Sequence, residues 1–416
     1  MSVYALQSVA GLGVFCALAW LVSENRRAFP WRLVAVGLLL QFALALFLLK
    51  VPVARSVLFA LNGVVEALSE ATQAGTALVF GYMGGGPAPF DVTAPEHAFI
   101  LGFQALPLVL VISALSALFW HWRILAWVTR GFAWALEKTM RLGGAVGFGT
   151  AANVFLGMVE APLLIRPYFE KLTRSELFML MSVGLATVAG TVIVLYAAIV
   201  GPVIEGALGQ IITASLISLP AAILMAQIMV PGDEVTETGR VEADLGYHSA
   251  MDAVTQGTAQ GLALLLNIIA MLLVLTALVA LVNIVLGTLP DVGGGPLTLQ
   301  RMLGWIFAPL VWLMGVPAGE SLTAGQLMGT KTILNEFLAY LEFARLPEEA
   351  LSPRADMIML YAMCGFANLG SVGIMIGGLT TLVPSRRQEI IGLSMKALVA
   401  GTLATSMTGA VIGILN

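Results

Sequence analysis

Stretches of about twenty apolar residues recur along this chain, and they limit its possible folds more than any other feature does. Each stretch is long enough to cross the roughly 30 Å hydrocarbon core of a bilayer as one helix. Only 11% of the residues are charged, about half the share typical of a soluble domain. The sequence therefore predicts an all-α polytopic membrane protein with eight transmembrane helices. The expected crossings are 3–22, 33–49, 99–120, 177–200, 211–230, 261–286, 357–383 and 390–415.

Residue types that bind metals or form disulfides are sparse. The two cysteines, Cys16 and Cys364, both lie inside apolar runs, so neither a disulfide framework nor a metal cluster is expected. The three histidines, His97, His121 and His248, fall at or beyond the ends of expected helices, which argues against a histidine metal site. No basic tract suggests binding to nucleic acid.

The lysines and arginines of the short loops predict the orientation in the membrane. Arg26, Arg27 and Arg32 follow the first crossing, so that loop is expected in the cytoplasm and the N-terminus outside. Three further segments are amphipathic or interrupted by polar residues, which suits helices that lie along the membrane surface. These expected interfacial helices are 55–80, 124–140 and 299–314.

Two apolar segments are expected to enter the membrane and return on the same side. The segment NVFLGMVEAPLLIRP, 153–167, has basic residues on both flanks, so both of its ends are expected in the cytoplasm. Its tip is expected at 156–160, because Gly157 and Pro162 suit backbone that leaves helical geometry. The segment 320–344 has mainly acidic flanks and is expected to open to the outer side. The sequence therefore predicts two opposed re-entrant hairpins.

A short internal repeat connects these hairpins with two of the crossings. GLATVAGTV, 184–192, and GFANLGSVG, 365–373, have the same order of glycine, polar and small residues and lie in crossings of opposite direction. Inverted repeats with broken helices usually surround a substrate and ion site near the bilayer midplane. Glycine and alanine also occur in membrane helices simply to allow close packing, and that alternative stays open for these stretches.

Each half also places one carboxylate at membrane depth, Glu160 in the first hairpin and Glu336 in the second. An ionisable group there costs roughly 2.5 kcal/mol or more, and such groups usually mark a transport pathway. Lys331, five residues before Glu336, is an alternative structural partner for that carboxylate. Asn153 and Asn368 are candidates for the site, or for capping half-helices.

At these motifs the chain resembles the concentrative nucleoside transporters. The matching stretches are NVFLGMVEAPLLIRP (153–167), GLATVAGTV (184–192), NEFLAYL (335–341) and CGFANLGS (364–371), and the resemblance extends over essentially the whole chain. It implies a multi-pass homotrimer of the cytoplasmic membrane that imports nucleosides, such as uridine, cytidine or adenosine, by an elevator mechanism. It further implies symport with a cation, either sodium or, as in some relatives, protons.

The resemblance also implies a division of the chain into scaffold and transport segments. Residues 1–122 and 231–296 correspond to scaffold spans, with the cytoplasmic loop in the second part. Residues 123–230 and 297–416 correspond to the two transport repeats, each with an interfacial helix, a hairpin, a broken span and a final span.

For the nucleoside, the resemblance implies a site with a sugar half and a base half. Glu336, Asn368 and Ser371 would bind the ribose hydroxyls, while Val192 and Phe366 would pack against the base. A carboxylate, an amide and a hydroxyl suit two adjacent hydroxyls chemically.

The tip of the first hairpin departs from the usual family pattern. Glu160 would face the nucleoside through a water molecule. Many relatives read Gly-Gln-Thr-Glu where this chain has Gly157, Met158, Val159 and Glu160. The family's glutamine and threonine bind the base edge, and methionine and valine cannot replace those hydrogen bonds. Base preference is therefore open.

For sodium, the resemblance implies ligands from the first hairpin and the first break. They are the Asn153 side chain, a carbonyl near Leu156, the Thr187 hydroxyl and the Val188 carbonyl. A hard cation prefers such all-oxygen ligation.

Nucleoside symport competes with other possible functions. An ion-coupled transporter of another small polar substrate remains the alternative. An anionic substrate is disfavoured, because only Lys331 offers a positive charge in the expected site. An intramembrane enzyme would need a nucleophile–base pair or metal ligands at membrane depth, and a passive channel would not need inverted hairpins with carboxylates at their tips.

Overall fold

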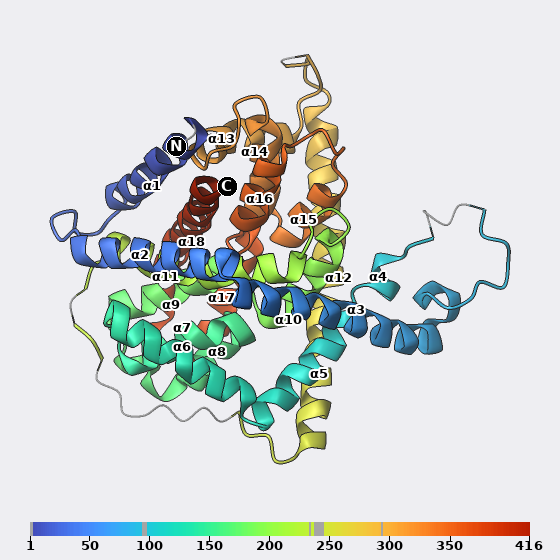
Figure 1. The fold of residues 1–416 in the computed structure, drawn as a ribbon, viewed down its shortest axis with the longest axis horizontal. Coiled ribbons are helices and arrows are strands. Elements are labelled where there is room, and N and C mark those ends of the chain that lie inside the picture. Colours follow the sequence, from blue (N-terminus) through green and yellow to red (C-terminus); the bar gives the residue numbers. More distant parts are fainter. Residues whose placement is uncertain (1–2, 94–97, 233, 237–244, 293) are drawn as a thin grey trace.

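The computed structural model describes residues 3–93, 98–232, 234–236, 245–292 and 294–416. All the regular secondary structure in these residues is helical, as the sequence predicts. His97 and part of the polar loop 231–252 lie outside the described residues. Figure 1 shows the helices packed around a central group formed by α9, α11 and α18.

Within the described residues, seven helical segments are long and apolar enough to cross a membrane. They are Val3–Leu21, Trp31–Lys50, Leu101–His121, Arg174–Val200, Ala207–Met229, Ala250–Leu286 and Pro384–Leu415. The eighth expected crossing, 357–383, consists of two shorter helices, α16 (Pro353–Met363) and α17 (Leu369–Leu382). Neither part alone reaches crossing length, which explains the difference in number.

Both repeat stretches coincide with helix breaks. The fourth crossing is divided into α9 (Arg174–Ala186) and α10 (Gly190–Val200), as the repeat predicted. The two unwound stretches touch, because the amide of Phe366 donates a 3.2 Å hydrogen bond to the carbonyl of Thr187. A Cβ on Gly365 would lie 2.7 Å from the carbonyl oxygen of Ala186, so this close approach requires glycine.

Both predicted hairpins are present. The first consists of α7 (Gly144–Leu156) and α8 (Glu160–Leu164), and its tip includes Gly157 with a φ of 102°. This left-handed conformation favours glycine and allows the sharp reversal. The second hairpin consists of α14 (Ser321–Ile333) and α15 (Glu336–Ala344). Asn335 caps α15 by accepting a 2.8 Å hydrogen bond from the amide of Leu338.

The loops expected in the cytoplasm meet at one end of the molecule. Glu24, between α1 (Val3–Leu21) and α2 (Trp31–Lys50), pairs with Arg174 and Lys396, each at 2.9 Å. At the other end, Ser8 donates a 2.8 Å hydrogen bond to the carbonyl of Met314, next to the open end of the second hairpin. Figure 1 shows both termini on this second side. The hairpins therefore open toward opposite ends.

The helices expected to be interfacial have nearly the expected bounds. They are α3 (Pro52–Phe80), α6 (Ile124–Met140) and α13 (Leu299–Leu313). The third crossing, expected as one helix, is divided into α4 (Leu101–Gln104) and α5 (Leu108–His121). Pro107 precedes α5 and lacks the amide hydrogen that a continuous helix would need.

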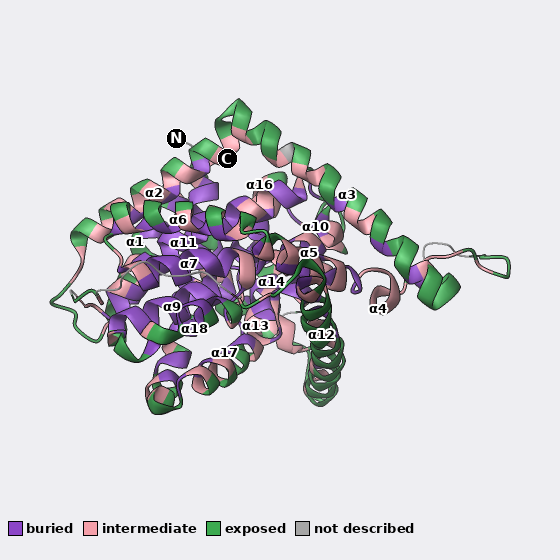
Figure 2. Cartoon of the chain, turned by 90° about the horizontal axis from the view of Figure 1, so that it is seen from below, coloured by how far each residue is buried: buried purple, intermediate pink, exposed green. Residues whose placement is uncertain are grey.

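The helix α12 (Ala250–Leu286) begins eleven residues before the expected start of its crossing. The expected crossing includes only the apolar part of the helix, whereas Ser249 caps the polar beginning by accepting a 3.1 Å hydrogen bond from the backbone amide of Asp252. Gly257 and Gly261 allow α12 to pack closely against α5. The rest of α12 is largely exposed, as Figure 2 shows.

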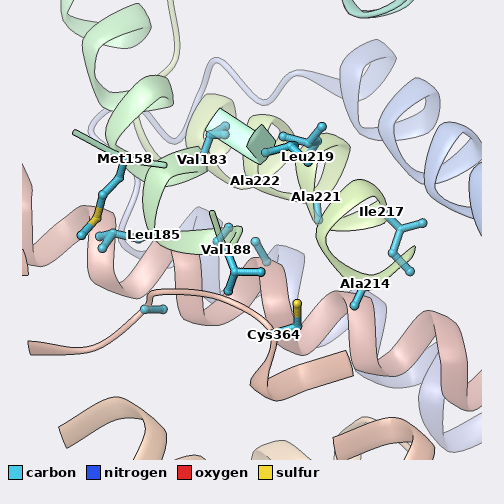
Figure 3. Close-up of a cluster of buried hydrophobic side chains, with 14 of the residues drawn as sticks. Met158, Val183, Leu185, Val188, Ala214, Ile217, Leu219, Ala221, Ala222 and Cys364 are labelled. Atoms are coloured by element: carbon cyan, nitrogen blue, oxygen red, sulfur yellow. The ribbon is translucent and has the colours of Figure 1, made fainter. Parts of the chain in front are cut away.

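The apolar core lies beside the two helix breaks. Figure 3 shows Met158 of the first hairpin tip, Val188 of the first break and Cys364 of the second break in one buried cluster. The other wall of the cluster comes from α11 (Ala207–Met229), including Ala214 and Ile217. This packing fixes the positions of both breaks relative to the hairpin tip.

Candidate functional site

A cavity of about 200 Å³ lies where the two hairpin tips, α10, α12 and α17 meet. All nine side chains and backbone positions expected to bind substrate line it. They are Gly157, Met158, Val159, Glu160, Val192, Glu336, Phe366, Asn368 and Ser371. Residues more than 200 positions apart in the sequence therefore meet at one cavity.

Glu336 is the most firmly held of the cavity carboxylates. Its Oε1 accepts a 2.6 Å hydrogen bond from the hydroxyl of Tyr196, and its Oε2 accepts a 2.8 Å hydrogen bond from the side-chain Nδ2 of Asn368. Glu336 is only 4% exposed, and as the first residue of α15 it lies at the positive end of that helix. An ionised carboxylate can accept about four hydrogen bonds, so acceptor sites remain for a ligand.

Asn368 has two roles in the structure. Its Oδ1 accepts a 2.7 Å hydrogen bond from the amide of Ser371 and thereby caps α17. Its Nδ2 donates to Glu336 at the same time. The sequence left open whether Asn368 caps a half-helix or belongs to the site. In the structure the same side chain does both. The cap also places Ser371 at the cavity, in the first turn of α17.

Lys331 does not form the ion pair with Glu336 that the sequence left open. Its Nζ donates 2.8 Å hydrogen bonds to the carbonyl of Ala362 and to the hydroxyl of Thr405. Among the described residues, no ion pair within 4.0 Å includes either Lys331 or Glu336. The fully buried ammonium instead satisfies the end of α16, and it leaves the carboxylate to the cavity.

The tip of the first hairpin forms the other end of the cavity. Glu160 begins α8, and a Cβ on Gly157 would lie 3.1 Å from its Oε2. Val159 faces α17, since a Cβ on Gly378 would lie 2.9 Å from its Cγ1. Met158 is 9% exposed and packs toward Gly184. This end of the cavity therefore has apolar side chains at the two positions where the resemblance to the family leads one to expect glutamine and threonine.

The expected sodium ligands lie beside the cavity. Asn153 donates a 2.6 Å hydrogen bond to the Thr187 hydroxyl and approaches the Val183 carbonyl at 3.4 Å. Val188 is fully buried in the same break, and Leu156 lines the cavity at the end of α7. The group offers amide, hydroxyl and carbonyl oxygens, which is the donor chemistry that a hard cation such as sodium prefers.

Four polar residues that line the cavity were not among the expected site residues: Thr191, Tyr196, Asn267 and Asn335. Tyr196 lies four residues after Val192, on the same face of α10, so helical spacing could have identified it. Asn267 lines the cavity from α12, and an amide inside an apolar crossing was the available signal.

Three family profiles match the chain. Residues 10–83 match the Na+ dependent nucleoside transporter N-terminus, and residues 210–413 match the C-terminus of the same family. Residues 102–203 match a domain described as nucleoside recognition. Together the three matches extend over most of the sequence.

Relatives align over nearly the full chain. An uncharacterized transporter of Haemophilus influenzae is 37% identical, with 98% of this chain and 97% of the relative aligned. The nucleoside permease NupC of Helicobacter pylori is 32% identical over 99% of this chain and 97% of its own. The sodium/nucleoside cotransporter 1 of Rattus norvegicus is also 32% identical, and 64% of its length is aligned.

Solved structures give the same result for the fold. The structure of CNTnw in an inward-facing substrate-bound state has a TM-score of 0.89 and 34% identity, with 99% of each chain aligned. A variant of CNTnw in an outward-facing state has a TM-score of 0.88, with 99% of this chain and 98% of that chain aligned. The fold therefore occurs in both of the conformations that alternating access requires.

Proposed function

Because this chain belongs to the Na+-dependent, concentrative nucleoside transporter family, we propose that it imports nucleosides by symport with sodium. It is a multi-pass membrane transporter rather than an enzyme. Each sodium ion that enters across 100 mV supplies about 2.3 kcal/mol, which can support a roughly 50-fold accumulation of an uncharged solute. Nucleosides are uncharged, so the membrane potential drives their import only through the coupled cation.

The observation that carries the proposal is the carboxylate of Glu336, held by Tyr196 and Asn368 at the cavity. A ribose presents two adjacent hydroxyl donors, and the free acceptor sites of this carboxylate match them. Asn368 and Ser371 add further polar groups at the same end of the cavity. We assign this end to the sugar.

We assign the other end of the cavity to the base. Val192 and Phe366 supply apolar surface for a flat ring, and Glu160 contacts the nucleoside through water. Met158 and Val159 can pack against the ring but cannot form hydrogen bonds with its edge. Uridine, cytidine and adenosine are all substrates in this proposal, because the sugar supplies most of the polar recognition.

The coupling ion is assigned to the oxygen cluster of Asn153, Leu156, Thr187 and Val188. The first break joins this cluster to the substrate cavity, since Phe366, which lines the cavity, is hydrogen-bonded through its amide to the Thr187 carbonyl. Binding of the cation would order the break and, through it, the sugar and base positions. Linkage then requires that the cation raise nucleoside affinity and the nucleoside raise cation affinity.

The transporter is proposed to be a homotrimer of the cytoplasmic membrane that works as an elevator. Residues 1–122 and 231–296 would form the scaffold, and residues 123–230 and 297–416 the moving transport domain. The long and largely exposed face of α12 supports a role for this helix outside the compact part of the chain.

Uptake of labelled uridine and adenosine into vesicles, with and without an inward sodium gradient, tests the proposal. Sodium-stimulated accumulation of both nucleosides is expected. Uptake that follows a proton gradient and ignores sodium would replace sodium by protons as the coupling ion. Failure to take up any nucleoside under either gradient would favour another small polar substrate.

A further inference from the structure

One wall of the cavity comes from a single stripe on α12. The residues of this stripe are spaced three and four positions apart, so they share one face of the helix. It consists of Leu264, Asn267, Ile268, Met271, Leu272 and Leu275. Asn267 is the only polar member. Every other polar side chain at the cavity comes from the hairpins, α10 or α17.

The side chain of Asn267 forms no hydrogen bond with another residue in the described part of the chain. Asn283, on the same helix, accepts a 2.8 Å hydrogen bond from the amide of Leu299 and donates to Gln300 at 3.1 Å. No such partner is found for Asn267 among the described residues. Asn267 is exposed and lines the cavity, so its carboxamide is available to a ligand there. Polar side chains inside membrane-spanning helices usually mark a substrate pathway.

The position of Asn267 along α12 falls at the base end of the cavity. Met271 marks the sugar end, because a Cβ on Gly370 would lie 3.6 Å from its Cε and 3.9 Å from the carbonyl of Leu334 at the second hairpin tip. From there α17 runs toward the first hairpin tip, which it meets where Gly378 faces Val159. Arg386, just after α17, donates to the carbonyls of Phe169 and Leu172. Thr236, in the loop before α12, donates to the carbonyl of Lys171. Since α17 ends on the side from which α12 starts, the two helices run in opposite directions, and Asn267 lies about one turn, or roughly 6 Å, from Met271 toward the first hairpin tip.

We propose that Asn267 is a specificity-determining residue that forms hydrogen bonds with the edge of the nucleobase. This inference rests on the proposed nucleoside site and deepens it. A carboxamide offers one acceptor and one donor side by side, and it can turn by 180° to present them in the reverse order. It therefore matches the N3–H and O4 of uracil as well as the N3 and amino group of cytosine. The residue recognises an unmodified base edge without preferring one natural base strongly.

The experiment uses the full-length protein in proteoliposomes with an inward sodium gradient. Uptake of labelled uridine is competed with uridine, cytidine, inosine and 3-methyluridine, which lacks the N3–H donor. The proteins compared are wild type, Asn267→Leu, Asn267→Ala and the control Leu266→Ala, on an exposed position outside the cavity.

In wild type, 3-methyluridine is expected to compete at least about fivefold less well than uridine, because one buried hydrogen bond is lost. The measured ratio is the concentration of 3-methyluridine over that of uridine needed for half-maximal competition. In both Asn267 variants this ratio falls toward one, while Leu266→Ala keeps the wild-type ratio. A methyl group rejected by shape alone would still be rejected in the variants. An unchanged ratio in variants that still transport uridine would therefore overturn the inference and leave the proposed function intact.

Two further outcomes also decide the matter. Loss of oligomer assembly in the Asn267 variants, with an unchanged competition ratio in the transporter that remains, would assign the amide to helix packing and overturn the inference. Absence of nucleoside uptake in wild type would overturn the proposed function, and the inference with it.

Discussion

The hydroxyl of Tyr196 lies 2.6 Å from Oε1 of Glu336, and this hydrogen bond joins the first repeat to the second at the cavity. Asn368 holds the other carboxylate oxygen at 2.8 Å. Hydrogen bonds to a charged group contribute more than those between neutral groups. The carboxylate is therefore oriented before a ligand arrives, and less side-chain freedom is lost on binding.

Tyr196→Phe should lower the transport efficiency for uridine about tenfold or more. The substitution removes a hydrogen bond to a charged group, worth about 1.5–3 kcal/mol, and keeps the aromatic ring that packs 5.2 Å from the ring of Tyr340. Kinetics of labelled uridine uptake measure the effect. Tyr340→Phe is the matched control, because its hydroxyl donates to the carbonyl of Leu360. Equal losses in the two variants would argue against a specific role for Tyr196.

Asn153→Ala and Thr187→Ala should raise the sodium concentration for half-maximal uptake by about tenfold or more. Each change removes an oxygen from the proposed cation site, and even outer-shell changes at metal sites cost about 10- to 100-fold. Sodium titration of uridine uptake provides the measurement, with potassium as the control cation. An unchanged sodium requirement in both variants would place the coupling ion elsewhere.

The double substitution Met158→Gln and Val159→Thr should sharpen the preference among bases. Met158 and Val159 offer no side-chain hydrogen bond to the base, so discrimination between uridine and other nucleosides should be weak, while 2′- and 3′-deoxy sugars are still penalised. A gained or lost buried hydrogen bond corresponds to about 5- to 150-fold in affinity. A competition panel of uridine, cytidine, adenosine and inosine measures the change. Strong single-base selectivity in wild type that persists in the double mutant would contradict this account of the tip.

Glu24 should stabilise the protein at neutral pH and lose this effect in acid. The hydrogen bond from Arg174, with help from Lys396, lowers the pKa of the Glu24 carboxyl from 4.5 to about 2. Its contribution is therefore complete above pH 4.5 and is lost as the pH falls toward 2. The effect should stay below about 1 kcal/mol, because both partners of the pair are partly exposed.

Thermal unfolding of wild type and Glu24→Gln in detergent, followed from pH 7 downward, measures this contribution. The two proteins should differ at pH 7 and converge as the pH approaches 2. Glu348→Gln, at an exposed carboxylate, serves as the control and should match wild type throughout. A difference that grows in acid would have the wrong sign.

The sequence was sufficient for the helix breaks and the hairpin tips, because their physical causes are local. Gly157 permits the left-handed tip, and the small residues around Thr187 and Gly365 allow two unwound stretches to touch. The division of the third crossing at Pro107 was missed, although proline was a visible signal. The start of α12 was missed because capping by Ser249 extends a helix beyond its apolar part.

The site was less predictable where it depends on contacts between distant segments. Sequence spacing alone could not show that Lys331 donates hydrogen bonds to Ala362 and Thr405 rather than pairing with Glu336, five residues away. Tyr196 pairs with a carboxylate 140 positions later, and no local pattern encodes that pairing. Asn267 joins the cavity only because α12 crosses in front of both hairpin tips.

Uptake of labelled uridine by Glu336→Gln, at equal expression and with oligomeric state checked, tests the central claim most directly. The amide keeps the shape of the side chain but removes the charge and one of the proposed acceptors for the ribose, so uptake should be abolished while the protein stays folded and keeps its oligomeric state. Glu342→Gln makes the same change in α15 outside the cavity, at a carboxylate that accepts from Thr330, and should retain transport. Near-normal uridine uptake by Glu336→Gln would contradict the assignment of the sugar site.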